Sequence, residues 1–201
     1  MPINKNPWWL FLITVVFLFY LTFFNEQINP LFQYQRSAIE QGQWWRFFTP
    51  HLSHLNIAHL LLNFPILLIV WWLFFSEKLG TALLLVFFIS SSLFCSVGLY
   101  LFSPKVTFYV GASGLLYGLL TFALLKKSLR DWLCLFPLAV IIGKVIFEQT
   151  QNYDVNYLQQ YIHYPVIVDV HLYGVIFGVT FAVGFFFVEK IKSPRLFHKS
   201  V

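Results

Sequence analysis

One stretch of the chain places a serine between glycines at the start of an apolar run. Residues 109–118 read YVGASGLLYG, with Ser113 near the middle. Such a serine can act as a nucleophile, because bare glycine backbone lets a substrate approach its hydroxyl. Two plainer interpretations stay open: the hydroxyl can be a helix N-cap, and Gly114 and Gly118 can form a helix-packing face. A nucleophile also needs a base and an oxyanion hole.

A histidine near the end of the chain is the candidate base. His171 opens the last apolar run, and Gly174 and Gly178 follow it on the same helical face. Two glycine-lined faces, this one and the face after Ser113, let two helices approach closely. A Ser–His hydrogen bond of about 2.6–3.2 Å needs that approach. The alternative is a histidine at the membrane interface with only its polar tip in water.

Donors for an oxyanion hole appear near the second apolar run. His59 and Asn63 are four residues apart, so they share one helix face. An acyl-transfer intermediate needs such donors in a sheltered site, and the backbone N–H of Ser113 at a helix start adds a third. A metal site is not favoured, because on a helix His54 would point about 140° away from His59 and no HExxH motif occurs.

No acid is placed by helical spacing to orient His171. Asp169 is two residues away, so it points to another side of the helix and can cap it instead. Tyr117 is four residues after Ser113, where its ring can stack on the histidine or simply pack in the core. The sequence therefore predicts a Ser113–His171 dyad.

These residues must be held by helices in a membrane. The 201 residues are 59% hydrophobic and only 10% charged, with a mean hydropathy of +0.72. A soluble domain carries about a quarter charged residues, so we expect an all-α integral membrane protein. The net charge of +5 then indicates topology and not nucleic acid. Cys95 and Cys134 lie in apolar runs and imply no disulfide framework.

The apolar runs predict six spans in a single domain of residues 1–201. The expected spans are residues 8–24, 55–75, 79–102, 111–125, 132–147 and 170–188. The fourth is short for a bilayer, which needs about 20 residues. Ser113 is therefore expected below the membrane surface, with the loop before it dipping inward, where non-helical backbone must be buried in protein or line a wet cavity.

Six spans place both termini on one side of the membrane. Nine lysines and arginines fall on that side and three on the other, which predicts cytoplasmic termini and an active site on the outer side. Residues 25–50 form a polar loop that is expected to be re-entrant or interfacial. Within it, Trp44, Trp45 and Arg46 are expected at the headgroup level.

Taken in order, these motifs resemble the rhomboid intramembrane serine proteases. The resemblance rests on a tryptophan–arginine pair before the second span, a GASG stretch, and the histidines and glycines of spans two and six: Trp45, Arg46, His54, His59, Asn63, Gly111, Ser113, Gly114, His171, Gly174 and Gly178. It implies a six-helix bundle with Ser113 as nucleophile and His171 as base. It also implies an oxyanion hole of His59, Asn63 and the Ser113 N–H, a supporting role for His54, and no cofactor.

Finer features are similar to one bacterial branch, the rhombosortases. They include residues 54–63, residues 103–111, Lys144 with Glu148 and Gln149, and residues 168–174. Tyr117 departs from that branch, where histidine is expected. The branch implies a bacterial inner-membrane protein whose membrane-anchored substrates end in a Gly-Gly signal, an apolar helix and basic residues. Cleavage would be followed by release or by transfer to a lipid-derived amine.

Lys144 and Glu148 are four residues apart near the outer end of the fifth span. They can form a salt bridge that only stabilises the end of the helix. Alternatively, Glu148 can receive a basic or amide group of the substrate. Two other functions remain for the whole chain. A catalytically inactive relative that binds or escorts membrane helices would lack the serine or the histidine, and a transporter would need a polar path through the membrane. Membrane lipids are expected partners, and nucleic acid is not.

Overall fold

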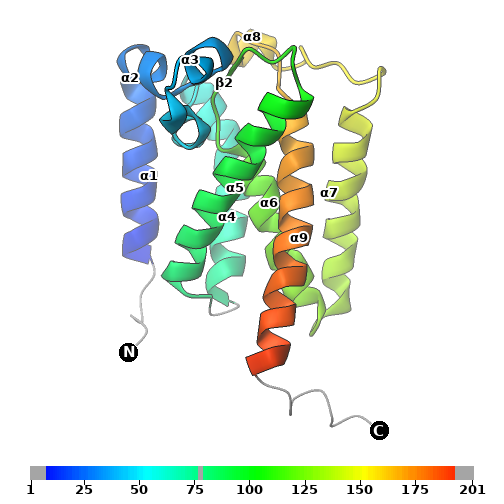
Figure 1. Ribbon diagram of the computed structural model, residues 1–201. Coiled ribbons are helices and arrows are strands. Elements are labelled where there is room, and N and C mark those ends of the chain that lie inside the picture. Colours follow the sequence, from blue (N-terminus) through cyan, green and yellow to red (C-terminus); the bar gives the residue numbers. More distant parts are fainter. Residues whose placement is uncertain (1–7, 77–78, 193–201) are drawn as a thin grey trace, which may run out of the picture.

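Six long helices run side by side in the part of the chain that the structure describes (Figure 1). The structure is a computed structural model, and it describes residues 8–76 and 79–192. The long helices are α1 (Trp8–Phe23), α4 (Ile57–Ser76), α5 (Thr81–Phe102), α6 (Ser113–Ser128), α7 (Leu135–Glu148) and α9 (Asp169–Lys192). The protein is therefore an all-α membrane bundle, and its helices follow the predicted spans within a few residues.

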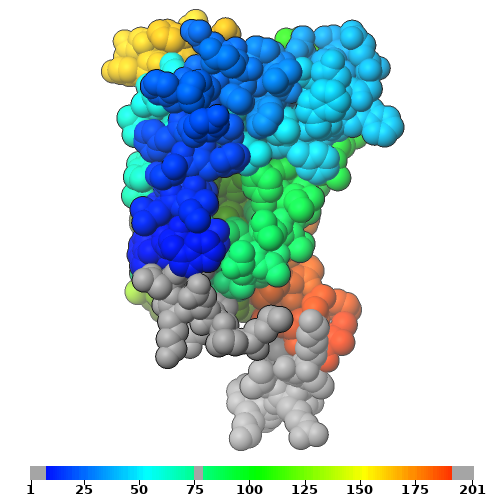
Figure 2. Space-filling view, turned by 90° about the vertical axis from the view of Figure 1, so that its left-hand side faces the viewer, coloured from blue at the N-terminus to red at the C-terminus, as the bar shows by residue number. Residues whose placement is uncertain are grey.

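Short elements gather at one end of the bundle. They are α2 (Asn25–Phe32), β1 (Tyr34–Gln35), α3 (Arg36–Glu40), η1 (Trp44–Phe47), η2 (Thr49–Leu52), β2 (Phe108–Tyr109) and α8 (Gln159–Ile162). The end that carries α2, α3 and α8 is called the capped end below (Figure 1). Strands β1 and β2 pair antiparallel, with Tyr34 opposite Tyr109, so the first loop is tied to the backbone that leads into α6. Figure 2 shows α1 and this loop, in blue, on the face toward the viewer.

Helix α6 lies at the centre of the bundle. All of its residues from Gly114 to Leu124 are buried, and α4, α5, α7 and α9 pack around it. Its contact with α9 is the closest: a Cβ added at Gly118 would lie 2.7 Å from the carbonyl oxygen of Gly174, and one at Gly114 2.6 Å from a methyl group of Val170. This is the close helix approach that the glycine spacing predicts.

Several helix boundaries differ from the predicted spans by a few residues. Helix α4 begins at Ile57, because the side chain of Asn56 accepts a hydrogen bond from the N–H of His59 at 2.9 Å and so caps the first turn. Helix α6 continues past Leu125 to Ser128, and its two lysines lie over aromatic rings, Lys126 over Phe185 and Lys127 over Trp72. The fifth run starts with a short 3-10 turn, η3 (Trp132–Cys134), ahead of α7.

The placement of Trp44, Trp45 and Arg46 at the headgroup level stays a prediction, and the structure shows how each of these side chains is buried or exposed. Trp44 and Trp45 are exposed as expected, but Arg46 is buried. Its guanidinium donates to the carbonyl oxygens of Pro30 and Gln33, each at 2.7 Å. The last carbonyls of a helix have no donor within the helix, so Arg46 closes the end of α2.

The number of spans stays a prediction. Ile57–Phe74, Thr81–Phe102 and Asp169–Ile191 are long and apolar enough to cross a membrane, and α1 with α2 adds a fourth candidate that is bent by 96°. Helices α6 and α7, of 16 and 14 residues, are shorter. Of the charges used for the topology, Lys5, Lys78, Arg195 and Lys199 lie outside the described residues.

Candidate active site

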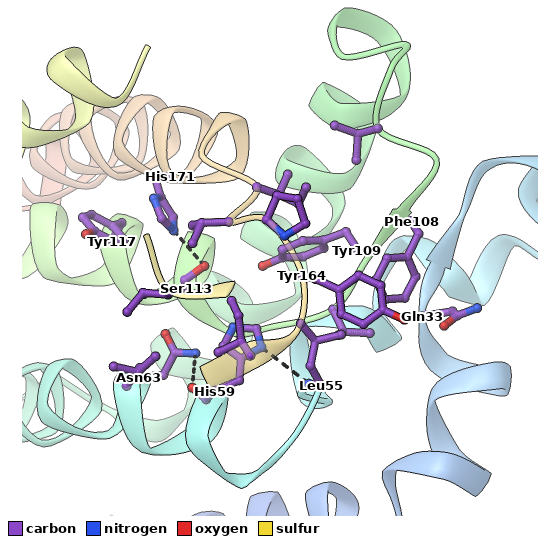
Figure 3. A pocket seen from close by; sticks show the side chains of 18 of the residues that line it. Gln33, Leu55, His59, Asn63, Phe108, Tyr109, Ser113, Tyr117, Tyr164 and His171 are labelled. Carbon is purple, nitrogen blue, oxygen red and sulfur yellow. Dashed lines mark hydrogen bonds between the residues drawn. The ribbon is translucent and has the colours of Figure 1, made fainter. Parts of the chain in front are cut away.

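Ser113 and His171 meet at the capped end of the bundle. Ser113 is the first residue of α6, and His171 lies in the first turn of α9. Their side chains point toward each other (Figure 3), and Nε2 of His171 is 3.0 Å from the hydroxyl oxygen of Ser113. His171 is almost completely buried. A hydroxyl within hydrogen-bond reach of an imidazole is the arrangement that activates a serine.

The backbone just before Ser113 adopts a conformation that requires glycine. Gly111 has φ +136, and a Cβ there would lie 2.9 Å from the imidazole of His59. The N–H of Gly111 donates to the carbonyl of Pro50 at 2.9 Å, and its own carbonyl accepts from the hydroxyl of Tyr109. The loop is thus fixed from two sides, which sets the start of α6 and the place of Ser113.

An acid does reach His171, which corrects the expectation from the sequence. Oε2 of Glu148, at the end of α7, is 2.9 Å from Nδ1 of His171. The two ring nitrogens of His171 therefore face a hydroxyl on one side and a carboxylate on the other. Asp169 is turned away, as expected, and accepts a hydrogen bond from Ser103, whose hydroxyl also lies 2.8 Å from that of Tyr173.

The ring of Tyr117 covers one face of His171. The ring centroids are 4.5 Å apart and the planes are 27° from parallel. The ammonium of Lys144 lies 5.2 Å from the centroid of the Tyr117 ring. Lys144 also forms an ion pair with Glu148. The side chain of Lys144 is 43% exposed, whereas that of Glu148 is 0% exposed, so Glu148 is in no position to receive a substrate group directly.

The link between Glu148 and His171 was missed because it depends on the rotation of α7 about its own axis. The available indication was a lone carboxylate in an apolar helix, at the same end of the bundle as His171. Helical spacing relates residues within one helix, and it does not say which neighbouring helix a face meets.

Two side-chain donors of α4 lie beside Ser113 (Figure 3). Nδ1 of His59 accepts a long hydrogen bond of 3.4 Å from the N–H of Leu55, which assigns the ring proton to Nε2. The amide nitrogen of Asn63 donates to the carbonyl of His59 at 3.2 Å and has a second hydrogen to offer. Both residues and Ser113 line the same cavity.

His54 is not on the helix of His59, so the predicted angle of 140° between them is wrong. His54 precedes α4, and the two rings meet edge to face with centroids 5.2 Å apart. His54 is fully buried, and burial lowers its pKa to about 3, so the ring is neutral at pH 7. Neutral His54 packs against His59 and helps to fix its orientation. In residues 8–76 and 79–192, no three His, Cys, Asp or Glu side chains form a metal-binding group.

The site opens into a cavity of about 700 Å³ at the capped end. Residues of α4, α6, α7 and α9 line one part of it, and residues 157–158, 162 and 164–167 line another. The polar groups that face the cavity include Ser113, His59, Asn63, Lys105 and Lys144. A cavity of this size can admit an extended segment of polypeptide.

Comparisons with known proteins point to one family. Residues 41–188 match the rhomboid domain, a range that contains all the site residues described above. The chain is 33% identical over 82 residues to YdcA, named as a candidate rhomboid protease of Bacillus subtilis, and the match covers 41% of each chain. It is 30% identical over 131 residues to the rhomboid protease GluP of the same organism, covering 61% of this chain and 25% of GluP. The chain thus matches less than half the length of either relative.

Proposed function

Because this chain belongs to the rhomboid family, we propose that it is an intramembrane serine protease that cuts membrane-anchored proteins near the outer face of the membrane. The observation that carries the proposal is the 3.0 Å contact between Ser113 and His171 inside a cavity. Both residues are present, which disfavours an inactive relative. The charge asymmetry of the sequence supports cytoplasmic termini and an active site on the outer side of the membrane. The rhombosortase-like motifs support a bacterial inner membrane, with the active site toward the periplasm.

In the first step, the Ser113 oxygen attacks the scissile carbonyl carbon while His171 takes the hydroxyl proton on Nε2. The carbonyl oxygen becomes an oxyanion, for which three donors are available: the N–H of Ser113, Nε2–H of His59 and the amide of Asn63. Collapse of the intermediate breaks the C–N bond, and His171 gives its proton to the leaving amine. An ester between Ser113 and the N-terminal part of the substrate remains.

The second step releases the substrate from Ser113. Water, deprotonated by His171, gives a carboxylate, and a primary amine in its place gives an amide. The rhombosortase-like motifs support substrates that end in Gly-Gly, an apolar helix and basic residues. Two glycines suit this site physically, because a backbone without side chains can reach a serine that lies below the membrane surface.

The nucleophile is tested by labelling with a fluorophosphonate probe in detergent. We expect the wild type to be labelled, and Ser113→Ala and His171→Ala to lose both labelling and cleavage. The double variant should lose no more than either single variant, because the two residues act as a unit. Labelling that persists in Ser113→Ala would show that another residue is the nucleophile.

Substrate class is tested separately in proteoliposomes. One substrate carries a Gly-Gly tail with an apolar helix and a basic end, and its matched control carries Val-Val in place of Gly-Gly. We expect cleavage of the first and slow or no cleavage of the second, with mass spectrometry reporting a carboxylate or an amide at the new C-terminus. Equal cleavage of both would leave a rhomboid protease without the proposed specificity.

A further inference from the structure

The carboxylate of Glu148 is buried and has two strong partners. One oxygen lies 2.9 Å from Nδ1 of His171, and the other forms the ion pair with Lys144. The hydroxyl of Tyr153 is a weaker third neighbour, 3.5 Å from that second oxygen. Each carboxylate oxygen therefore has its own partner, and one of them is the candidate catalytic base.

We propose that Glu148 is a positioning residue that orients His171, so that the site works as a Ser113–His171–Glu148 triad with Lys144 holding the carboxylate. The proposal rests on the proposed protease function and goes beyond it, because the helical pattern alone gives only a serine and a histidine.

The physical reason begins with the tautomer of His171. A carboxylate can only accept, so its contact with Nδ1 requires a proton on that nitrogen. Nε2 is then left with a lone pair, which is what the Ser113 proton needs. When His171 takes that proton it becomes a cation, and a carboxylate 2.9 Å away stabilises it. The stacked ring of Tyr117 fixes the imidazole plane but does neither of these things.

Burial of Glu148 argues against a role confined to the helix end. A solvent-exposed i,i+4 pair contributes only about 0.3–0.5 kcal/mol, and an ionised carboxylate out of water is costly unless it is fully paired. Here the carboxylate is completely buried and points toward His171, while Lys144 reaches it from the cavity side. An ion pair that only stabilised the end of α7 could form at the surface, without the cost of burying the carboxylate.

Several ionisable groups lie on the elements that surround the site, and the test must allow for them. They are Glu148 and Lys144 on α7, His59 on α4, Tyr117 on α6, Cys95 on α5, Tyr109 on β2, Tyr153 after α7, and Asp169 and Tyr173 on α9. Of these, only Glu148 makes a hydrogen bond to the imidazole in the part of the chain that the structure describes. Asp169 is the matched control, because it is an acid on the same helix that bonds to Ser103 instead.

The experiment measures the rate of fluorophosphonate labelling of Ser113 against pH for the purified full chain. In Glu148→Gln the rate should fall by up to about 10⁴, because the amide can turn its NH₂ group to Nδ1 and select the wrong tautomer. The pH profile of the remaining activity should also differ from that of the wild type, because Nδ1 of His171 has lost its carboxylate partner. Glu148→Asp should recover part of the rate with a pH profile close to that of the wild type.

Lys144→Gln should change the pH profile as well. Glu148 then keeps its contact with His171 but loses the cation that pairs with its other oxygen. Asp169→Asn should keep the wild-type labelling rate and pH profile. Thermal unfolding of each variant shows whether it is folded.

The outcomes separate this proposal from the proposed function. If the wild type is not labelled at Ser113, the protease itself is refuted. If the wild type is labelled but folded Glu148→Gln reacts at the wild-type rate with the same pH profile, the triad is refuted and the dyad stands. Should Glu148→Gln fail to fold, the pH profile of Lys144→Gln decides. A wild-type profile of the labelling rate in that variant would also overturn the proposal.

Discussion

At the scale of single residues, Asn63 is the donor whose role can be measured most directly. Its amide bonds to the carbonyl of His59 one turn earlier and lines the cavity beside Ser113. This bond leaves one N–H free for a developing oxyanion. The hydrogen bond to His59 therefore orients the Asn63 amide and still leaves it a donor for the substrate.

Asn63→Ala should lower kcat by about 10²–10³, the usual effect of removing one oxyanion donor. KM and thermal stability should change little, since the lost hydrogen bond to His59 is only one of many in α4. Steady-state cleavage of a tail peptide measures kcat and KM, and unfolding of the same preparation measures stability. Normal kcat with a lowered Tm would make Asn63 a structural residue only.

At the scale of elements, the contact between α6 and α9 sets the distance between nucleophile and base. Backbone meets backbone at this contact, where Gly114 and Gly118 face Gly174 and Gly178. Ser113 and His171 lie at the same end of these two helices, so a change in helix separation acts directly on the 3.0 Å contact.

Gly174→Ala should separate the two helices and inactivate the protein, because the added Cβ would collide with the carbonyl group of Gly114. The expected result is a lower Tm and loss of labelling at Ser113. Gly184→Ala on the same helix is the control, since a Cβ there meets nothing within 4 Å and alanine favours a helix. Gly174→Ala with wild-type labelling would show that the close packing is not needed for the site.

At the scale of the whole molecule, all the site residues lie at one end of the bundle. The ends of α1 and α9 that lead to the termini lie at the opposite end (Figure 1). That arrangement agrees with an even number of crossings. Lys126 and Lys127 lie in the last turn of α6, and Arg130 follows that helix. All three are at the end away from the site, where the charge bias places the cytoplasm.

Reporter fusions should therefore place both termini in the cytoplasm and the 150–160 loop outside. The reporters are alkaline phosphatase, which is active outside, and a fluorescent protein, which is active inside. If the reporters place both termini outside, the molecule has the opposite orientation and its active site faces the cytoplasm. Termini on opposite sides would instead mean an odd number of spans.

The sequence by itself determined the helices and predicted the pair, Ser113 and His171, that the structure brings together. Long apolar runs in a chain with 10% charged residues can only satisfy their backbone as helices in a membrane. Helical spacing then gave the glycine faces after Ser113 and His171, and the pairing of His59 with Asn63. All of these are relations between residues of one helix. They can be predicted from the sequence because a helix has a fixed rise and rotation per residue.

Only the tertiary structure decided which side chains meet across helices. Glu148 reaches His171 because α7 is turned to face α9, Arg46 is buried because α2 ends beside it, and His54 lies against His59 because α4 starts late. Each depends on the rotation, offset or starting point of an element relative to its neighbours. Packing of whole faces sets those quantities, and no spacing within one helix contains them.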